Sequence, residues 1–323
     1  MAFLILFISA ALAGMAGYSA QRASVCSVRA VRDAVERRDL RLLASFAKAA
    51  AWAMAFALPL GWAIHGEIDA DLPPLGLAAL AGGFLFGLGA SLNNGCAIST
   101  ISHLASGEGA MLMTLLGFAS GALAVEETFG ADLALAGVSA TPLARPSILG
   151  LVVLGFAWIW ALLELRHLIA GGKDERTRLL AFAAVGLGLC SGVLFALQGP
   201  WVYTAAIVQT SGFAIGHGLP PSPALLLLFA AVLAGSMLSA LRAGRFRLRW
   251  QGTRPWYGHL GGGVMMGGGA ALVPGGNDAV LLHALPLGAE HALPAFAAML
   301  LGVYTGLALA RVGSGATLRH VTG

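Results

Sequence analysis

The sequence predicts an all-α membrane protein with about nine transmembrane helices in two inverted-topology repeats, with broken helices at the centre. Three observations support this prediction. Hydrophobic residues fill 58% of the 323 positions and charged residues only 11%, which is too little charge for the solvated surface of a soluble domain. Apolar runs long enough to cross a bilayer recur along the chain. Glycine-rich motifs of the first half also return in the second half at a nearly constant offset.

Nine apolar runs are expected to span the membrane, each close to the roughly 20 residues that a transmembrane helix needs. Basic residues follow the first run instead of preceding it, so we interpret it as a span and not as a signal peptide. Glycine is abundant, at 45 residues, as expected where helices approach closely in lipid. The expected spans are residues 2–20, 44–63, 74–93, 109–125, 146–167, 179–197, 223–242, 258–274 and 292–310.

The loops between these spans alternate in charge. Cytoplasmic loops carry an excess of Lys and Arg, so the alternation predicts an external N-terminus and a cytoplasmic C-terminus. Because the net charge of +4 is confined to particular loops, it indicates membrane orientation and not nucleic-acid binding. The basic loop residues are Arg22, Arg29, Arg32, Arg37, Arg38, Arg41, Arg166, Lys173, Arg176, Arg178, Arg242, Arg245, Arg247, Arg249, Arg254, Arg311 and Arg319, and the acidic ones are Glu67, Asp69, Asp71, Glu126, Glu127 and Asp132.

The two halves of the chain repeat each other. Gly87-Leu88-Gly89-Ala90 returns 180 positions later as Gly267-Gly268-Gly269-Ala270, and the segment Gln21–Ser27 can be laid on Gln198–Thr204 at an offset of 177. Equivalent loops have opposite charge, which predicts that the second half is inverted in the membrane. We therefore expect a first repeat over residues 1–145, a connecting span and cytoplasmic loop over residues 146–177, and a second repeat over residues 178–323.

Two polar segments interrupt apolar runs at about bilayer depth: Asn93-Asn94-Gly95 in the first half and Pro274-Gly275-Gly276-Asn277-Asp278 in the second. Non-helical backbone is tolerated at that depth only where it is buried in protein or lines a cavity. A helix that restarts near Cys96 would direct its backbone N–H groups and its positive dipole end at the break. Such a site suits an anion. The alternative interpretation is a pair of packing kinks.

The most specific motif of the chain is the glycine-rich stretch that ends at Gly95-Cys96 and is followed by Gly107 and Gly109. Together with Gln21-Arg22, Cys26 and Arg32-Asp33, it resembles the YeeE/YedE family of bacterial inner-membrane proteins, which take up thiosulfate and related sulfur compounds. The resemblance spans essentially the whole chain. It implies a pore in which Cys96 is the central contact for the sulfur of the substrate and Cys26 is the contact at the cytoplasmic exit.

The second-half motif departs from the family pattern. Thiosulfate carriers of the family hold a cysteine at or beside the position of Gly276, and this chain has no cysteine there. The departure weakens the assignment of thiosulfate as the substrate but not that of transport through the same pore. The chain has only three cysteines and no C-x-x-C motif, so neither a disulfide framework nor a metal site is expected. We interpret the third cysteine, Cys190, as a packing residue.

Several polar residues near the breaks are further candidates. An ionisable residue inside the membrane is a functional candidate by default, and Asp278 could bind a proton, bind a coupling cation or cap the following helix. His103 and His283 occupy matching positions as structural residues or proton carriers. Gln21 and Gln198 could gate the pore or bond across helices. The complete expected substrate pathway is Gln21, Cys26, Asn94, Gly95, Cys96, His103, Gly275, Gly276, Asn277, Asp278 and His283.

We interpret the chain as a transporter and not as an enzyme, one that imports a small, thiosulfate-like sulfur anion. No cofactor is implied, and the chain lacks the G-x-x-x-x-G-K-[ST] loop of an ATP-driven engine. The first alternative is a membrane thiol protein that relays sulfur covalently to a cytoplasmic sulfur-carrier protein. The second is a transporter of a different solute through the same pore, with Asn277 and Asp278 as its filter.

Overall fold

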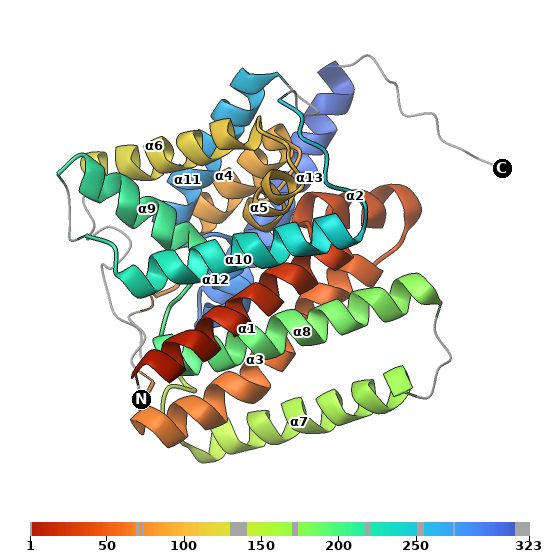
Figure 1. Cartoon of the computed structure of the whole chain (residues 1–323), viewed down its shortest axis with the longest axis vertical. Helices are drawn as coiled ribbons and strands as arrows, with labels where there is room; N and C mark the ends of the chain where they lie inside the picture. Colours follow the sequence, from red (N-terminus) through yellow and green to blue (C-terminus); the bar gives the residue numbers. More distant parts are fainter. Residues whose placement is uncertain are drawn as a thin grey trace.

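The computed structural model of the chain describes residues 2–68, 72, 74–129, 141–169, 174–216, 220–250, 255–273 and 275–313. Within these ranges the chain is helical and has no strand, apart from a single β-bridge between Glu108 and Arg249 (Figure 1). The predicted all-α class is therefore confirmed. Several residues singled out above lie outside the described residues: Asp69, Asp71, Asp132, Lys173, Arg254, Pro274 and Arg319.

Nine long helices correspond to the nine expected spans. Eight segments of the described chain are long and apolar enough to cross a membrane, so the chain is a multi-pass membrane protein. The remaining expected span is α11, which has 17 residues. The long helices are α1 (Ala2–Ala23), α3 (Arg41–His65), α4 (Leu77–Asn93), α6 (Met111–Phe129), α7 (Ile148–Ile169), α8 (Glu175–Gln198), α10 (Pro223–Arg242), α11 (Trp256–Leu272) and α13 (Ala292–Gly313).

Short helical segments follow breaks after α1, α4, α8 and α11. They are α2 (Ser27–Arg37), α5 (Ala97–Ala105), α9 (Tyr203–Ala214) and α12 (Asn277–Ala279), the last continued by a π-helical turn, Val280–Ala284. The sequence predicted the breaks before α5 and α12. It did not predict α9, because the polar and aromatic residues after the sixth span have no regular apolar period.

The helices pack in pairs that relate the two halves. Helix α1 packs on α10 and α3 on α8, while α6 packs on α11 and α13 on α4. If α1 through α6 are matched in order to α8 through α13, each of these contacts has a counterpart in the other half. The contacts are therefore symmetric between the two halves, and the inverted-topology repeat stays a prediction. Helix α7 lies at the edge of the bundle against α3, as expected for a connecting span (Figure 1).

Glycines bring the two central helices, α4 and α11, into backbone contact. A Cβ added at Gly262 would lie 2.7 Å from the backbone nitrogen of Asn93, and one added at Gly269 would lie 2.5 Å from the carbonyl oxygen of Gly82. Any larger side chain at these positions would force the helices apart. This close approach replaces, in lipid, the hydrophobic driving force that holds helices together in water.

Ion pairs gather the charge-bearing segments at one end of the bundle. Arg41 at the start of α3 pairs with Asp174 before α8 at 3.0 Å, and Arg176 pairs with Asp33 of α2 at 2.9 Å. Arg311 near the end of α13 pairs with Glu36 of α2. The basic segments that the charge pattern assigned to one side of the membrane are therefore in contact with one another.

Reporter fusions test the predicted orientation. A reporter fused after Arg178 or Arg249 is expected to give a cytoplasmic signal, and one fused after Asp69 or Glu127 an external signal, because basic loops stay on the cytoplasmic side. Paired alkaline phosphatase and fluorescent-protein fusions measure the two outcomes. External signals from two basic loops would contradict the inverted-repeat topology.

Candidate functional site

Both breaks of the first half begin with the same helix ending. After α4, Asn94 adopts the left-handed conformation with φ of 60°, and the N–H group of Gly95 donates to the carbonyl of Ala90 at 2.9 Å. After α1, Ser24 takes the left-handed conformation with φ of 52°, and the following residue makes the same bond back into the helix. This is the Schellman pattern, which satisfies carbonyl groups that the broken helix would otherwise leave unpaired.

Each of these endings places a cysteine two residues later, at the N-cap of the next helix. Cys26 precedes α2 and Cys96 precedes α5, and the carbonyl of each accepts the first helical hydrogen bond at 2.9 Å. Neither thiol caps its own helix. The two thiols are free and interact with each other. The positive ends of two helices therefore converge on a pair of thiols, an arrangement that favours a nearby anion.

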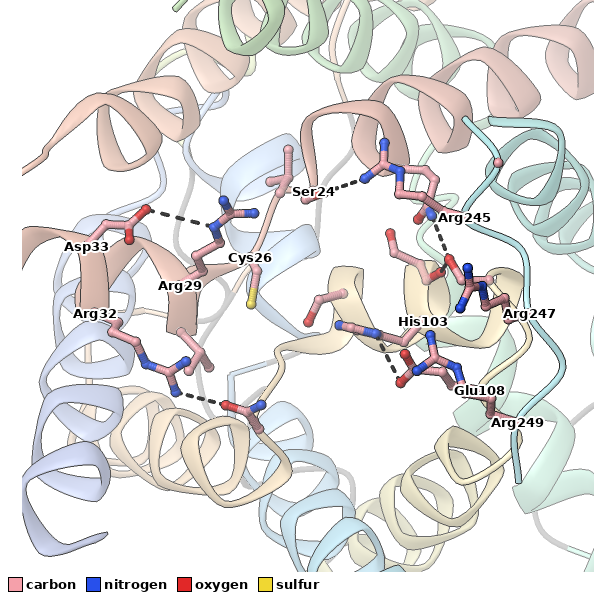
Figure 2. A pocket seen from close by; sticks show the side chains of 18 of the residues that line it. Ser24, Cys26, Arg29, Arg32, Asp33, His103, Glu108, Arg245, Arg247 and Arg249 are labelled. Atoms are coloured by element: carbon pink, nitrogen blue, oxygen red, sulfur yellow. Dashed lines mark hydrogen bonds and ion pairs between the residues drawn. The ribbon is translucent and has the colours of Figure 1, made fainter. Parts of the chain in front are cut away.

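A cavity of about 640 Å³ opens beside Cys26, and we call it the vestibule. Figure 2 shows the Cys26 sulfur facing into it, within a ring of basic side chains. Cys96 is fully buried and does not line it. The vestibule wall carries six arginines against two carboxylates, so the cavity is electropositive. These charged residues are Arg29, Arg32, Arg37, Arg245, Arg247, Arg249, Asp33 and Glu108.

Two of the arginines also bind the breaks. Arg32 Nη2 donates to Asn94 Oδ1 at 2.9 Å, which ties α2 to the break after α4. Arg245 Nη1 donates to Ser24 Oγ at 3.1 Å, which ties the segment after α10 to the break after α1 (Figure 2). The vestibule arginines thus fix the backbone that carries the thiols, besides making the cavity positive.

Gln21 and His103 line the vestibule, and their roles in transport stay predictions. Gln21 Nε2 donates to Ser106 Oγ at 2.8 Å. His103 Nδ1 lies 3.2 Å from Glu108 Oε2 (Figure 2). The hydrogen bond with His103, supported by the positive charge of Arg249, lowers the pKa of Glu108 below its ordinary value. Glu108 is therefore a permanent negative charge at neutral pH, and it offsets part of the arginine charge.

A buried network behind Cys96 was missed by the sequence analysis. Asn93 Nδ2 donates to the carbonyl of Gly95 at 2.9 Å and so holds the break directly. Asn93 Oδ1 accepts from Thr114 Oγ1 at 2.7 Å and lies 2.7 Å from Nδ1 of His259, which is fully buried in α11. The second half thereby positions the break of the first half. A histidine inside an expected span was itself a signal that could have identified His259.

The break of the second half has a different chemistry. Gly275 has φ of 112° and Gly276 is the N-cap of α12. Asp278 is fully buried, accepts from Thr204 Oγ1 at 3.2 Å and interacts with the N–H group of Ala279. A Cβ added at Gly276 would lie 2.7 Å from Asp278 Oδ1. The Asp278 side chain would therefore have to shift to admit any larger residue at position 276.

The structure separates the remaining candidates from the vestibule. His283 is buried against Phe195, with ring centroids 5.0 Å apart, so its surroundings differ from those of His103. Gln198 Nε2 donates to Ser9 Oγ at 2.9 Å, a bond across helices. Cys190 is buried within α8 and does not line the vestibule. The pathway role given to His283 and the packing role given to Cys190 stay predictions.

Comparison with known proteins identifies one family. A family model described as sulphur transport matches residues 22–305, which covers most of the chain, including both cysteine-bearing breaks and the second-half motif. The resemblance drawn from the sequence motifs is thereby confirmed. No curated protein matches the chain.

A pair of substitutions tests whether His259 acts through its hydrogen bond to Asn93. In His259→Asn the amide nitrogen can take the place of Nδ1, so stability should stay close to wild type. In His259→Gln the amide reaches past Asn93, and the lost buried bond should cost about 1–3 kcal/mol. Thermal unfolding in detergent measures both variants. Equal destabilisation by the two substitutions would show that His259 contributes packing and not this bond.

Proposed function

The chain belongs to the sulphur transport family, and from that premise we propose that it imports a small sulfur-containing oxoanion of the thiosulfate type across the bacterial inner membrane. Residues 1–145 and 178–323 would form the inverted repeats, joined by the span and loop of residues 146–177. The anion would pass the second-half break first, then Cys96 and then Cys26. It would leave through the vestibule on the cytoplasmic side.

The observation that carries this proposal is the contact between Cys26 and Cys96 at two converging helix N-termini. A thiol is a weak hydrogen-bond donor with a soft, polarizable sulfur. Two such groups in series provide successive weak contacts for the sulfur end of an anion. Conduction requires binding of this kind, strong enough to admit the substrate and weak enough to release it.

The charge of the vestibule suits its role as the exit. An excess of arginines attracts anions toward this side. Part of that charge is offset, since Asp33 lies 3.8 Å from Arg29 and 3.6 Å from Arg37. The substrate would therefore be drawn out of the narrow region without meeting a deep electrostatic trap.

The contact between the two thiols also favours a second candidate function, a covalent sulfur relay. A Cys96 thiolate could attack the outer sulfur of thiosulfate, forming a persulfide while sulfite leaves. The Cys26 thiolate could then take that sulfur, with one S–S bond broken and one formed, and pass it to a cytoplasmic sulfur-carrier protein. Detection of a persulfide on Cys96 during turnover would favour the relay over transport of the intact anion.

Uptake assays test the proposed substrate class. Labelled thiosulfate, sulfite and sulfate are offered to proteoliposomes containing the wild-type protein, with and without a pH gradient. We expect thiosulfate or sulfite to be taken up and sulfate, which exposes no soft sulfur atom, to be excluded. Lack of uptake of all three anions would contradict the proposed function and leave the transport of a different solute.

Substitution of single cysteines tests the thiol path. Cys96→Ala is expected to abolish uptake or reduce it at least tenfold, because no other group can supply the central sulfur contact. Cys26→Ala is expected to reduce uptake less, since Cys26 lies at the wider vestibule. Cys190→Ala is the matched control, because it removes an equally buried thiol outside the path. Normal uptake by a well-folded Cys96→Ala variant would make Cys96 a packing residue.

A neutral substitution at Asp278 separates its proposed roles. An ionised carboxylate about 4 Å from the substrate anion would repel it by roughly 4 kcal/mol at an effective dielectric constant near 20. If the carboxylate only stabilises the N-terminus of α12, Asp278→Asn should preserve transport and change its pH dependence only slightly. Uptake and exchange are measured across a pH gradient. Loss of proton- or cation-driven uptake with intact exchange would instead identify Asp278 as a coupling site.

A further inference from the structure

Several buried polar groups near the second-half breaks have no hydrogen-bond partner among the described residues. They include the indole nitrogen of Trp201, the hydroxyl of Tyr203 and both side-chain atoms of the Asn277 amide, besides Nε2 of His283. All four residues are more than nine-tenths buried. Buried polar groups are nearly always paired in folded proteins, and each exception calls for an explanation. Unsatisfied side chains at neighbouring breaks indicate a ligand that accepts hydrogen bonds.

Two of these residues line the same cavity. Trp201 and Tyr203 border a space of about 30 Å³, together with Asp278 and the small residues Ala16 and Gly17 of α1. Tyr203 is the first residue of α9, a helix of 12 residues, so the positive end of that helix also faces this region. The cavity thus combines unpaired donors with a helix N-terminus.

The cavity adjoins the vestibule, because Ser102 lines both of them. Ile98 and Ile101 of α5, the helix that begins directly after Cys96, also border the cavity. In the alignment of Gln21–Ser27 with Gln198–Thr204, Tyr203 stands where the first half has Cys26. The hydroxyl replaces the thiol at the equivalent point of the second half.

We propose that Trp201, Tyr203 and Asn277 form a donor site for the oxygen atoms of a sulfur oxoanion. This inference rests on the proposed function and adds the residues that bind the oxygen atoms of the substrate. Hydrogen-bond donors recognise oxygen, whereas the thiols contact sulfur. The substrate must therefore carry both kinds of atom, as thiosulfate and sulfite do, and it passes from oxygen contacts to sulfur contacts.

The arrangement of Asp278 is compatible with an anion at this site. Its carboxyl group accepts a hydrogen bond from the Thr204 hydroxyl and interacts with the N–H group of Ala279, and these donors offset part of its negative charge. In the described conformation the cavity has room for about one water molecule. An oxoanion is larger, so its entry requires α9 and the second-half break to separate.

Removal of one hydroxyl tests the donor site. Tyr203→Phe keeps the ring and its packing, and Tyr304→Phe, at a half-exposed position of α13, is the matched control. The Michaelis constant for labelled thiosulfate in proteoliposomes is expected to rise about tenfold in Tyr203→Phe, the loss typical of one hydrogen bond to a charged group. Tyr304→Phe should match wild type. Trp201→Phe provides a second variant that removes only a donor from an aromatic residue.

The outcomes distinguish this inference from the proposed function. If wild type takes up thiosulfate but Tyr203→Phe and Trp201→Phe both keep Michaelis constants within twofold of wild type, the donor site is wrong and the thiol path stands. If wild type transports none of the three anions, the proposed function itself fails. Should Tyr203→Phe not fold, the Michaelis constant of Trp201→Phe decides.

Discussion

The need to pair every backbone polar group within a lipid bilayer is the constraint on which this structure depends. A helix that stops inside the membrane exposes N–H and C=O groups that hydrocarbon cannot satisfy. At the ends of α1 and α4, Ser24 and Asn94 adopt the left-handed conformation. The N–H group of the next residue then pairs with a carbonyl of the helix that has just ended. The first-turn N–H groups of the next helices are then directed at the thiols, since those of Ser27 and Ser99 interact with Cys96 and that of Arg29 with Cys26. The helix endings that pair these carbonyl groups therefore also place two helix N-termini, which favour an anion, around Cys26 and Cys96.

The two halves apply the same backbone plan to different side-chain chemistry. Thiols stand at the N-caps of the first half, whereas the corresponding region of the second half carries Gly276, the Tyr203 hydroxyl and the Asp278 carboxylate. In the proposed pathway, these unequal ends would treat the two ends of an asymmetric anion differently.

Much of the fold could be predicted from local sequence, because a span depends on the length of one apolar run. The break at Gly95 was also visible, since polar residues interrupt such a run. The break before α9 was not, because Gly199 and Pro200 follow a complete span and resemble an ordinary loop. Contacts such as Asn93 with His259, 166 positions apart, depend on which helices pack together, and no local pattern contains that information. The close approach of the Asp278 carboxylate to Gly276 could not be predicted from the sequence either, because it depends on the conformation of one side chain.

The glycine contact between α4 and α11 has a mechanical consequence. Helices that touch backbone to backbone have no flexible side chains between them to absorb sliding or tilting. This central pair therefore acts as a stiff frame, and the deformable parts of the molecule are the short segments α2, α5, α9 and α12. Such light elements rearrange faster than whole domains. The packing therefore favours movement of these short segments over rocking of one half of the molecule against the other.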